Sequence, residues 1–225
     1  MTSLLDELDA RIADLPLAAG PLRGLRREFS RRLTKAEPRD VVTLAMRLVE
    51  RAGIERRFVA YELVHHQRRA LASLGARDVE RLGRGLDGWG AVDAFACYVA
   101  GPAWRERQVS DALIRRWARS RDRWWRRAAL VSTVPLNNRA RGGRGDTART
   151  LAICRLLVAD RDDMVVKAMS WALRELAKRD PTAARRFVAT HRSALAARVV
   201  REVRNKLDTG LKSPRRGSGR RRRAT

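Results

Sequence analysis

The sequence has few of the residues from which metal sites and disulfides are built. Among 225 residues there are two cysteines and three histidines, and Cys97 and Cys154 lie far apart among apolar neighbours. This spacing fits neither a metal-ligand motif nor a disulfide framework. It is typical of buried free thiols in a reducing compartment. We therefore predict that the protein uses neither a metal nor another cofactor.

Long apolar runs are missing as well. No window approaches about 18 consecutive apolar residues, the length that a membrane span needs. The first residues, MTSLLDELDA, are acidic and lack the basic start and apolar core of a signal peptide. These absences predict a soluble, cytoplasmic protein that makes no membrane contact.

Acidic residues are scarce relative to basic ones. The chain has 25 Asp and Glu against 50 Lys and Arg, which gives a formal net charge of +25. Folding does not require this excess, and self-repulsion makes it costly, so an anionic polymer is the expected partner. A genome rich in G and C would explain why Arg replaces Lys. It would not explain why basic residues outnumber acidic ones.

Two segments of the sequence match each other at a fixed offset. Residues 121–132 read RDRWWRRAALVS and residues 161–172 read RDDMVVKAMSWA, so that Arg127 aligns with Lys167. A period near forty residues with helical patterning is typical of stacked helix pairs of the HEAT and armadillo kind. No stretch shows the alternation expected of strands. We predict an all-α fold, a curved solenoid of HEAT-like repeats, in which both segments are second helices of their repeats.

Glycine, proline and charge patterns divide the chain further. Residues 1–210 are expected to form one domain, and residues 211–225 a disordered basic tail with seven basic residues and no acid. The positions of glycine and proline also predict three helix boundaries. One helix covers 55–74, another ends at Gly101-Pro102, and a third covers 104–120.

One loop is too basic to be an ordinary connection between helices. The loop 135–146 contains Arg139, Arg141 and Arg144, with three glycines and a single acid. It is either a mobile arm that lies along a phosphate backbone or an ordinary solvated loop. Composition alone does not separate the two interpretations.

Six tryptophans are many for a chain with four Phe and two Tyr. Most of them suit packing within or between repeats: Trp104, Trp117, Trp124 and, ambiguously, Trp125. Trp89 differs because it lies in a glycine-flanked turn at a helix start, and Asp93 follows one helical turn later on the same face. Trp171 follows Lys167 at the same spacing and shares the face of that basic residue.

A purely structural interpretation is open for each of these residues. In helical repeats an Asp and a basic residue often form a ladder between repeats, which would account for Arg127 and Lys167. Asp93 could likewise cap a helix or pair with an arginine. Together, however, two indoles, a carboxylate and a basic row on one concave surface favour a binding site, because exposed bulky aromatics are costly unless something binds there.

These residues also carry a family resemblance. The chain resembles the AlkD-like alkylpurine DNA glycosylases, the HEAT-like-repeat DNA alkylation repair family. The matching elements are W-x-x-x-D at Trp89–Asp93, W-x-R-A-A at 125–129, and K-A-x-x-W-x-L-R-E at Lys167–Glu175. The resemblance is strongest from about Gly88 to Leu207 and extends plausibly back to Leu22.

The resemblance implies excision of cationic N3- and N7-alkylated purines from double-stranded DNA by a monofunctional enzyme that has no base-flipping pocket. Asp93 would be the catalytic carboxylate, Trp89 and Trp171 would face the deoxyribose of the lesion, and Arg127 would hold a backbone phosphate. Further DNA contacts are expected from the repeat helices and the basic loop: Lys167, Arg126, Arg139, Arg141 and Arg144. A DNA partner of this kind implies a monomer that is associated with the nucleoid.

Two other functional classes stay open on the sequence alone. Because some relatives have the fold with little glycosylase activity, the chain could be a non-catalytic HEAT-repeat module that binds DNA. The basic loop and tail look longer than the simplest family pattern, and they could shift preference toward branched or single-stranded DNA. A protein-binding scaffold is the third class, and the positive charge argues against it.

Overall fold

The computed structural model describes residues 2–214 and contains only helices and loops in that range. The helices in chain order are α1 (Thr2–Ala13), α2 (Ala19–Arg32), α3 (Pro38–Glu50), α4 (Ile54–His66), α5 (Arg68–Ala72), α6 (Ala76–Leu82), α7 (Trp89–Phe95), the π-helical η1 (Ala96–Ala100), α8 (Gly101–Arg105), α9 (Asp111–Ala118), α10 (Arg123–Val131), α11 (Val134–Asn137), the 3-10 turn η2 (Arg139–Arg141), α12 (Thr147–Leu156), α13 (Asp163–Ala177), α14 (Pro181–Thr190) and α15 (Ala197–Thr209). The predicted all-α fold is confirmed.

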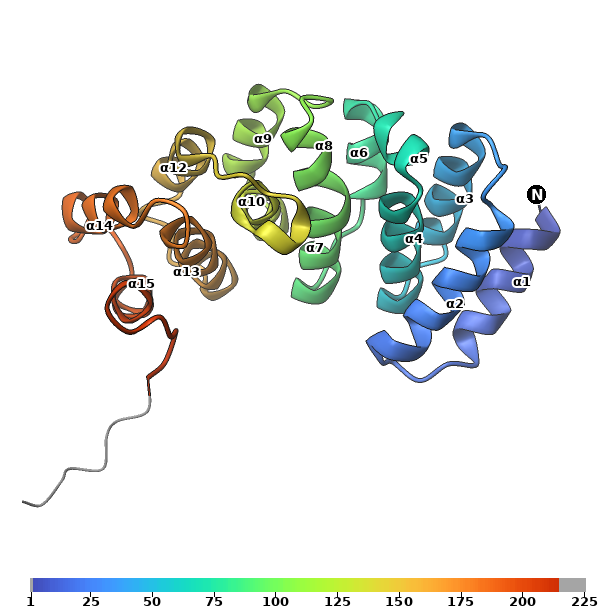
Figure 1. Cartoon of the computed structure of the whole chain (residues 1–225), viewed down its shortest axis with the longest axis horizontal. Helices are drawn as coiled ribbons and strands as arrows, with labels where there is room; N and C mark the ends of the chain where they lie inside the picture. The colour runs from blue at the N-terminus through green and yellow to red at the C-terminus, as the bar shows by residue number, and fades with distance from the viewer. Residues whose placement is uncertain (1, 215–225) are drawn as a thin grey trace, which may run out of the picture.

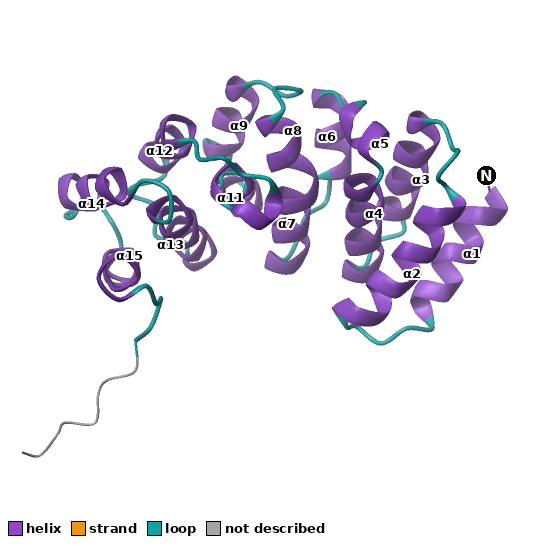
Figure 2. Ribbon diagram, in the orientation of Figure 1, coloured by secondary structure: helices purple, strands orange, loops and turns teal. Residues whose placement is uncertain are grey.

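The helices follow one another along an arc (Figures 1 and 2). An inner row is formed by α2, α4, α7, α10, α13 and α15, in which each helix packs against the next. An outer row includes α3, α9, α12 and α14, which pack against members of the inner row. The protein is therefore a helical-repeat solenoid, and the two matching segments contain the inner helices α10 and α13.

The matching segments are also equivalent in their local structure. Asp122 begins α10 by accepting a hydrogen bond from the Trp124 amide at 2.8 Å, and Asp162 begins α13 by accepting one from the Met164 amide at 2.9 Å. An Asp at this position satisfies an amide that would otherwise lack a partner. The forty-residue offset thus reproduces the same helix start in successive repeats.

Two of the three predicted helix boundaries are wrong because turns interrupt the helices. The segment 55–74 divides at Gln67, whose extended ψ of 88° separates α4 from α5 and whose side chain donates to the Ser30 carbonyl at 2.9 Å. The segment 104–120 divides after α8, where Arg107 adopts a positive φ of 64°. Ser110 then begins α9 by accepting from the Leu113 amide.

The third predicted boundary, at Gly101-Pro102, is also wrong, because the helix continues through it. The π-helical turn η1 leads directly into α8 without a break, and Pro102 lies where the one passes into the other. Gly101 serves close packing instead. A Cβ there would lie 2.8 Å from both the Ala96 and Ser132 carbonyl oxygens and from the Pro135 ring.

The segment 135–146 is part of the folded structure rather than a mobile arm or a simple solvated loop. It contains the end of α11 and the turn η2, and Pro135 and Leu136 are buried. Arg179, just after α13, donates to the Asn137 carbonyl at 2.7 Å and to the Gly143 carbonyl at 2.6 Å. Gly142 and Gly145 have positive φ angles and turn the chain, and a Cβ at Gly143 would lie 2.6 Å from the Pro135 carbonyl oxygen, so the glycines allow turning and close packing.

The first residues of the predicted tail also have defined positions. Gly210 ends α15 in the left-handed conformation, with a φ of 73°, and turns the chain back along the helix. The Asn205 side chain then donates to the Lys212 carbonyl at 3.1 Å. Residues 215–225, to which the rest of the tail prediction applies, lie outside the described residues.

The core fills the space between the two rows and contains both cysteines. Trp104 and Trp117 are buried, and Trp125 packs edge-on against Phe95. Cys97 and Cys154 are buried free thiols, and burial raises the pKa of each to about 12. Within residues 2–214 no helix is long and apolar enough to cross a bilayer, and no group of His, Cys, Asp and Glu could hold a metal ion.

Candidate functional site

A carboxylate and a guanidinium from neighbouring inner helices form the centre of the site. Asp93 on α7 accepts two hydrogen bonds from Arg127 on α10, from Nε to Oδ1 at 2.9 Å and from Nη2 to Oδ2 at 2.8 Å. The two side chains are mostly buried, with exposed fractions of 18% for Asp93 and 7% for Arg127. A bidentate contact of this kind fixes both position and orientation.

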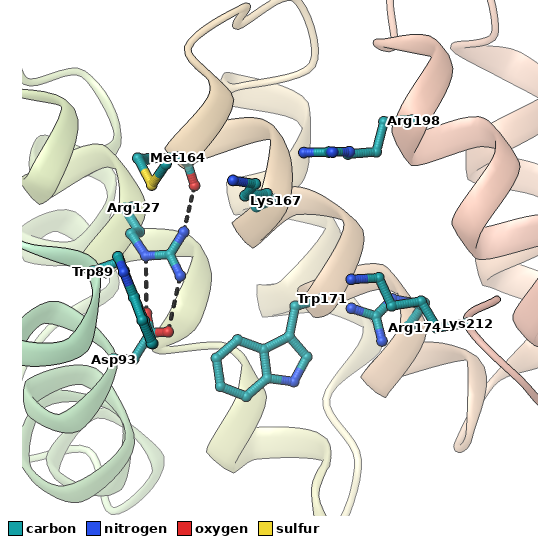
Figure 3. A pocket seen from close by; sticks show the side chains of 9 residues that line it. All are labelled: Trp89, Asp93, Arg127, Met164, Lys167, Trp171, Arg174, Arg198 and Lys212. Atoms are coloured by element: carbon teal, nitrogen blue, oxygen red, sulfur yellow. Dashed lines mark hydrogen bonds and ion pairs between the residues drawn. The ribbon is translucent and has the colours of Figure 1, made fainter.

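Arg127 is itself anchored from the other side of the cleft. Its Nη1 donates to the carbonyl of Met164 at the start of α13, at 2.6 Å (Figure 3). A guanidinium has five N–H donors, so three are used by these contacts and two remain, one on each terminal nitrogen. Arg127 therefore holds Asp93 in place and connects α7, α10 and α13.

Burial and pairing act on Asp93 in opposite directions. Burial raises the pKa of Asp93 above its ordinary value because water no longer solvates the charge, while the hydrogen bonds and charge of Arg127 lower it, and the raised direction prevails. Carboxylates that are desolvated beside a specific partner and line a cleft are candidates for catalytic groups.

Two indoles share the cleft with this ion pair. Trp89 begins α7 and is 63% exposed, an unusual fraction for so large an apolar side chain. Trp171, on α13, is half-buried and packs partly against the core. In Figure 3, Trp89 and Asp93 form one wall and Trp171 approaches from the other. The cleft has a volume of about 390 Å³ and is lined by Trp89, Asp93, Arg127, Met164, Lys167, Trp171, Arg174, Arg198 and Lys212.

The cleft thus contains five residues that the sequence predicted as parts of one site: Trp89, Asp93, Arg127, Lys167 and Trp171. Lys167 lies in the cleft, but it does not repeat the pairing of its register mate Arg127. Its Nζ contacts Asp163 on the same helix at 2.6 Å, and 44% of the side chain is exposed. Lys167 is therefore available to an anion in the cleft, whereas most of the Arg127 guanidinium is committed to protein groups.

Arg126 does not reach the cleft. Its Nε donates to Asp160 at 2.7 Å, and its Nη1 donates to the carbonyls of Ser120 and Arg121. It joins the loop before α10 to the loop before α13, and only 19% of the side chain is exposed. This contact between repeats is of the kind that the sequence left open for Arg127 and Lys167, and the DNA contact expected of Arg126 stays a prediction.

The arginines of the segment 135–146 also lie outside the cleft lining. Arg139 and Arg144 are exposed, whereas Arg141 lies over the ring of Tyr98, 5.1 Å from its centre. The Arg141 carbonyl accepts a hydrogen bond from Arg105. These three residues can contribute to the positive potential of the protein, but they do not build the site around Asp93.

Sequence reasoning missed four lining residues: Met164, Arg174, Arg198 and Lys212. Arg174 lies inside the K-A-x-x-W-x-L-R-E element, three residues after Trp171, so its position on the helix gave a usable signal. Arg198 and Lys212 come from α15 and the turn after it. They had no such signal because they reach the cleft only through the packing of α15 against α13.

A comparison with protein families agrees with this arrangement. The family model described as DNA alkylation repair enzyme matches residues 17–207, which include every inner helix from α2 to most of α15. The chain belongs to this family. The resemblance found at Trp89–Asp93 and Lys167–Glu175 is thereby confirmed. A comparison with curated proteins finds no match to the chain.

Membership of the DNA alkylation repair enzyme family connects the charge to a partner. The family acts in DNA repair, so DNA is the anionic polymer that the excess of basic residues indicated. The matched segment ends at residue 207, before Lys212. The cleft thus includes one cation from beyond the part of the chain that the family pattern covers.

Proposed function

We propose that the protein is a monofunctional DNA glycosylase that hydrolyses the N-glycosidic bond of cationic N3- and N7-alkylated purines in duplex DNA. The observation that carries the proposal is the Asp93 carboxylate, held by Arg127 in a cleft between the exposed Trp89 and the half-buried Trp171. A carboxylate and two indole faces in one open cleft suit a substrate on which positive charge develops.

The leaving group needs little help from a general acid. An N3- or N7-alkylated purine carries a positive charge and leaves as a neutral base when the bond between C1′ and the purine nitrogen breaks, with the electron pair going to the base. Positive charge then develops on the sugar. Asp93 stabilises this charge electrostatically, and the indole faces stabilise it by cation–π attraction.

Water completes the reaction at C1′. Asp93 orients the attacking water and accepts its proton as the new C–O bond forms. No amine is needed as a nucleophile. Although Lys167 and Lys212 line the cleft, the proposed mechanism uses neither as a nucleophile. Borohydride is therefore expected to trap no covalent complex, and a trapped complex would contradict the monofunctional mechanism.

The open shape of the cleft supports contact from the sugar and phosphate side. Its lining is dominated by charged side chains, with two aromatic residues, instead of the enclosing apolar walls of a pocket that receives a flipped base. A lesion that stays stacked in the duplex could still present its deoxyribose to Trp89, Trp171 and Asp93.

The second candidate function is a non-catalytic DNA-binding module. It is favoured by one observation, namely that Asp93 is already paired with Arg127, as a structural ion pair would be. In that case the cleft would bind phosphate through its cations, with a preference for branched or single-stranded DNA. Both candidates require affinity for DNA that falls with salt, by a log–log slope of about −0.9 for each phosphate neutralised on duplex DNA.

The substitution Asp93→Asn separates the two candidates. It keeps the shape of the side chain and removes the charge that faces the developing cation. Loss of a preorganised electrostatic group lowers the rate by about 10²- to 10³-fold. Release of 7-methylguanine from duplex DNA should be measured in single turnover, beside DNA affinity and a thermal melt. Affinity should hold or rise, because a carboxylate near phosphates repels them.

A matched control is needed because Asp93→Asn also leaves Arg127 buried without its counter-ion, which destabilises the fold in either case. Glu62 on α4 provides this control. It is a buried carboxylate that binds Arg23 and Arg26 and does not line the cleft. Glu62→Gln should lower the melting temperature and leave excision per folded molecule unchanged. Normal excision by folded Asp93→Asn protein would exclude the catalytic assignment.

A further inference from the structure

The turn after α15 brings a lysine into the cleft. Gly210 adopts a φ of 73°, and its amide donates to the Lys206 carbonyl at 3.1 Å, which closes the helix. The chain then runs back along the last turn, where the Asn205 side chain holds the Lys212 carbonyl. As a result, Lys212 lines the cleft opposite Trp89 and Asp93 (Figure 3).

The buried carboxylate of Glu202 attracts cations to the wall of the cleft that is formed by α13, α15 and the turn after α15. Glu202 on α15 is 8% exposed, and its Oε2 accepts a hydrogen bond from Ser170 Oγ at 2.6 Å. Its carboxylate oxygens also lie 3.7 Å from Lys212 Nζ, 3.8 Å from Arg198 Nε and 3.9 Å from Arg174 Nε. These three distances exceed a hydrogen bond, so Glu202 attracts the cations without consuming their donors.

The charges of this wall do not balance. Its cations are Lys167, Arg174, Arg198 and Lys212, and the carboxylates paired with them are Asp163 and Glu202. Four positive charges minus two negative ones leave +2. On the opposite wall Arg127 and Asp93 compensate each other. Among the described lining residues the surplus charge therefore belongs to one side of the cleft, next to Trp171.

We propose that Lys212 binds a backbone phosphate of the damaged strand, the one adjacent to the nucleoside between Trp89 and Trp171. This proposal rests on the proposed function for the identity of that nucleoside. Lys212 is suited to the contact because its side chain is 53% exposed and its ammonium acts as a point charge toward phosphate. Glu202 and the Gly210 turn are positioning elements that hold the ammonium at the cleft.

The first test measures phosphate contact without depending on base excision. The affinity of the full chain for an undamaged duplex should be followed against salt concentration for the wild type, Lys212→Ala and Lys178→Ala. Lys178 is the matched control, since it is 45% exposed, pairs with Glu175 and does not line the cleft. Lys212→Ala should make the log–log slope shallower by about 0.9, the value for one phosphate, and Lys178→Ala should not.

The second test locates the phosphate. A duplex with a tetrahydrofuran abasic-site analogue fixes the register, and a neutral methylphosphonate then replaces each phosphate flanking the analogue in turn. One replacement should weaken binding by the wild type and have little effect on Lys212→Ala, because the variant has already lost that contact. Equal weakening of both proteins at every position would overturn the proposal.

The two tests distinguish this proposal from the proposed function. If Lys212→Ala changes the salt slope and the wild type releases no alkylated purine, Lys212 contacts phosphate but the glycosylase assignment fails. If excision is normal and Lys212→Ala keeps the wild-type slope, the glycosylase assignment stands and Lys212 serves only to pair with Glu202. Equal slope changes for Lys212→Ala and Lys178→Ala would also overturn the proposal, because general charge would explain both.

Discussion

Both carboxylate oxygens of Asp93 accept hydrogen bonds from one guanidinium, that of Arg127, which in turn donates to the Met164 carbonyl across the cleft. The pair therefore has two consequences at once. It fixes the direction of the Asp93 carboxylate, and it ties the wall formed by α7 and α10 to the start of α13. Changes to Arg127 should act on excision through Asp93 as well as through any phosphate.

Arg127→Lys separates these effects. Lysine keeps the positive charge but cannot form the two-pronged contact with Asp93. We expect DNA affinity to change little and single-turnover excision to fall. Arg127 lowers the pKa of Asp93 and burial raises it, so a weaker pair should let the pKa rise further. The pH–rate profile should then shift to higher pH. An unshifted profile with a lower rate would indicate that Arg127 acts on phosphate alone.

The pH dependence of the wild type provides a second prediction. Burial raises the pKa of Asp93, so the carboxylate that we propose as catalytic is lost as pH falls through a value above the ordinary 3.8. Below that value the excision rate, after subtraction of uncatalysed depurination, should fall about tenfold per pH unit. Far-ultraviolet circular dichroism must show that the protein stays folded in this range.

Protonation of Asp93 has opposite effects on excision and on the stability of the fold. Folding raises the pKa of Asp93, so folding favours its protonated form. The contribution of Asp93 to the unfolding free energy must therefore increase as pH falls through the raised pKa. The difference in unfolding free energy between the wild type and Asp93→Asn should grow in the pH window where excision declines. A parallel decline of both would point to acid unfolding instead.

The tryptophans should differ in what they contribute. Trp89 is 63% exposed, so Trp89→Ala should change the unfolding free energy by less than about 0.5 kcal/mol. Loss of one cation–π contact of about 0.5–2 kcal/mol should lower excision roughly 2- to 30-fold. Trp171→Ala should lower excision and stability together. Trp124→Ala is the control, since this indole is outside the cleft lining, and its excision per folded molecule should match the wild type.

The close packing at Gly101 predicts a change in stability without a change at the site. In Gly101→Ala the new Cβ would lie 2.8 Å from two carbonyl oxygens and a proline ring. Overpacking of this kind costs about 1–3 kcal/mol, measurable as a lower urea midpoint. Gly24→Ala, in α2, is the matched helical control, because its Cβ would meet nothing closer than 4.0 Å. It should be neutral or stabilise the fold.

Periodicity and motif spacing predicted much of this molecule. The forty-residue offset correctly placed α10 and α13 in successive repeats, and the spacing of Trp89 and Asp93 correctly placed both on one helix of the cleft. These features depend on local sequence, where side chains three or four positions apart share a face. The same reasoning located Trp171 beside Lys167.

Contacts between distant segments were the part that sequence could not give. Arg126 and Arg127 are adjacent, yet one joins two loops and the other binds Asp93, because successive residues on a helix point in different directions. Lys212 was assigned to a tail because its surroundings are basic and not periodic. Its place in the cleft depends on the Gly210 turn and on Glu202, which is distant from the predicted motifs.

The two buried thiols have a consequence for the chemical durability of the protein. The thiolate is the form of cysteine that reacts with electrophiles, and burial raises the pKa of Cys97 and Cys154 to about 12. Near neutral pH both sulfurs are protonated and shielded from solvent. Electrophiles that alkylate purines should therefore leave the cysteines unmodified, so that the protein can persist under the conditions that create its proposed substrate.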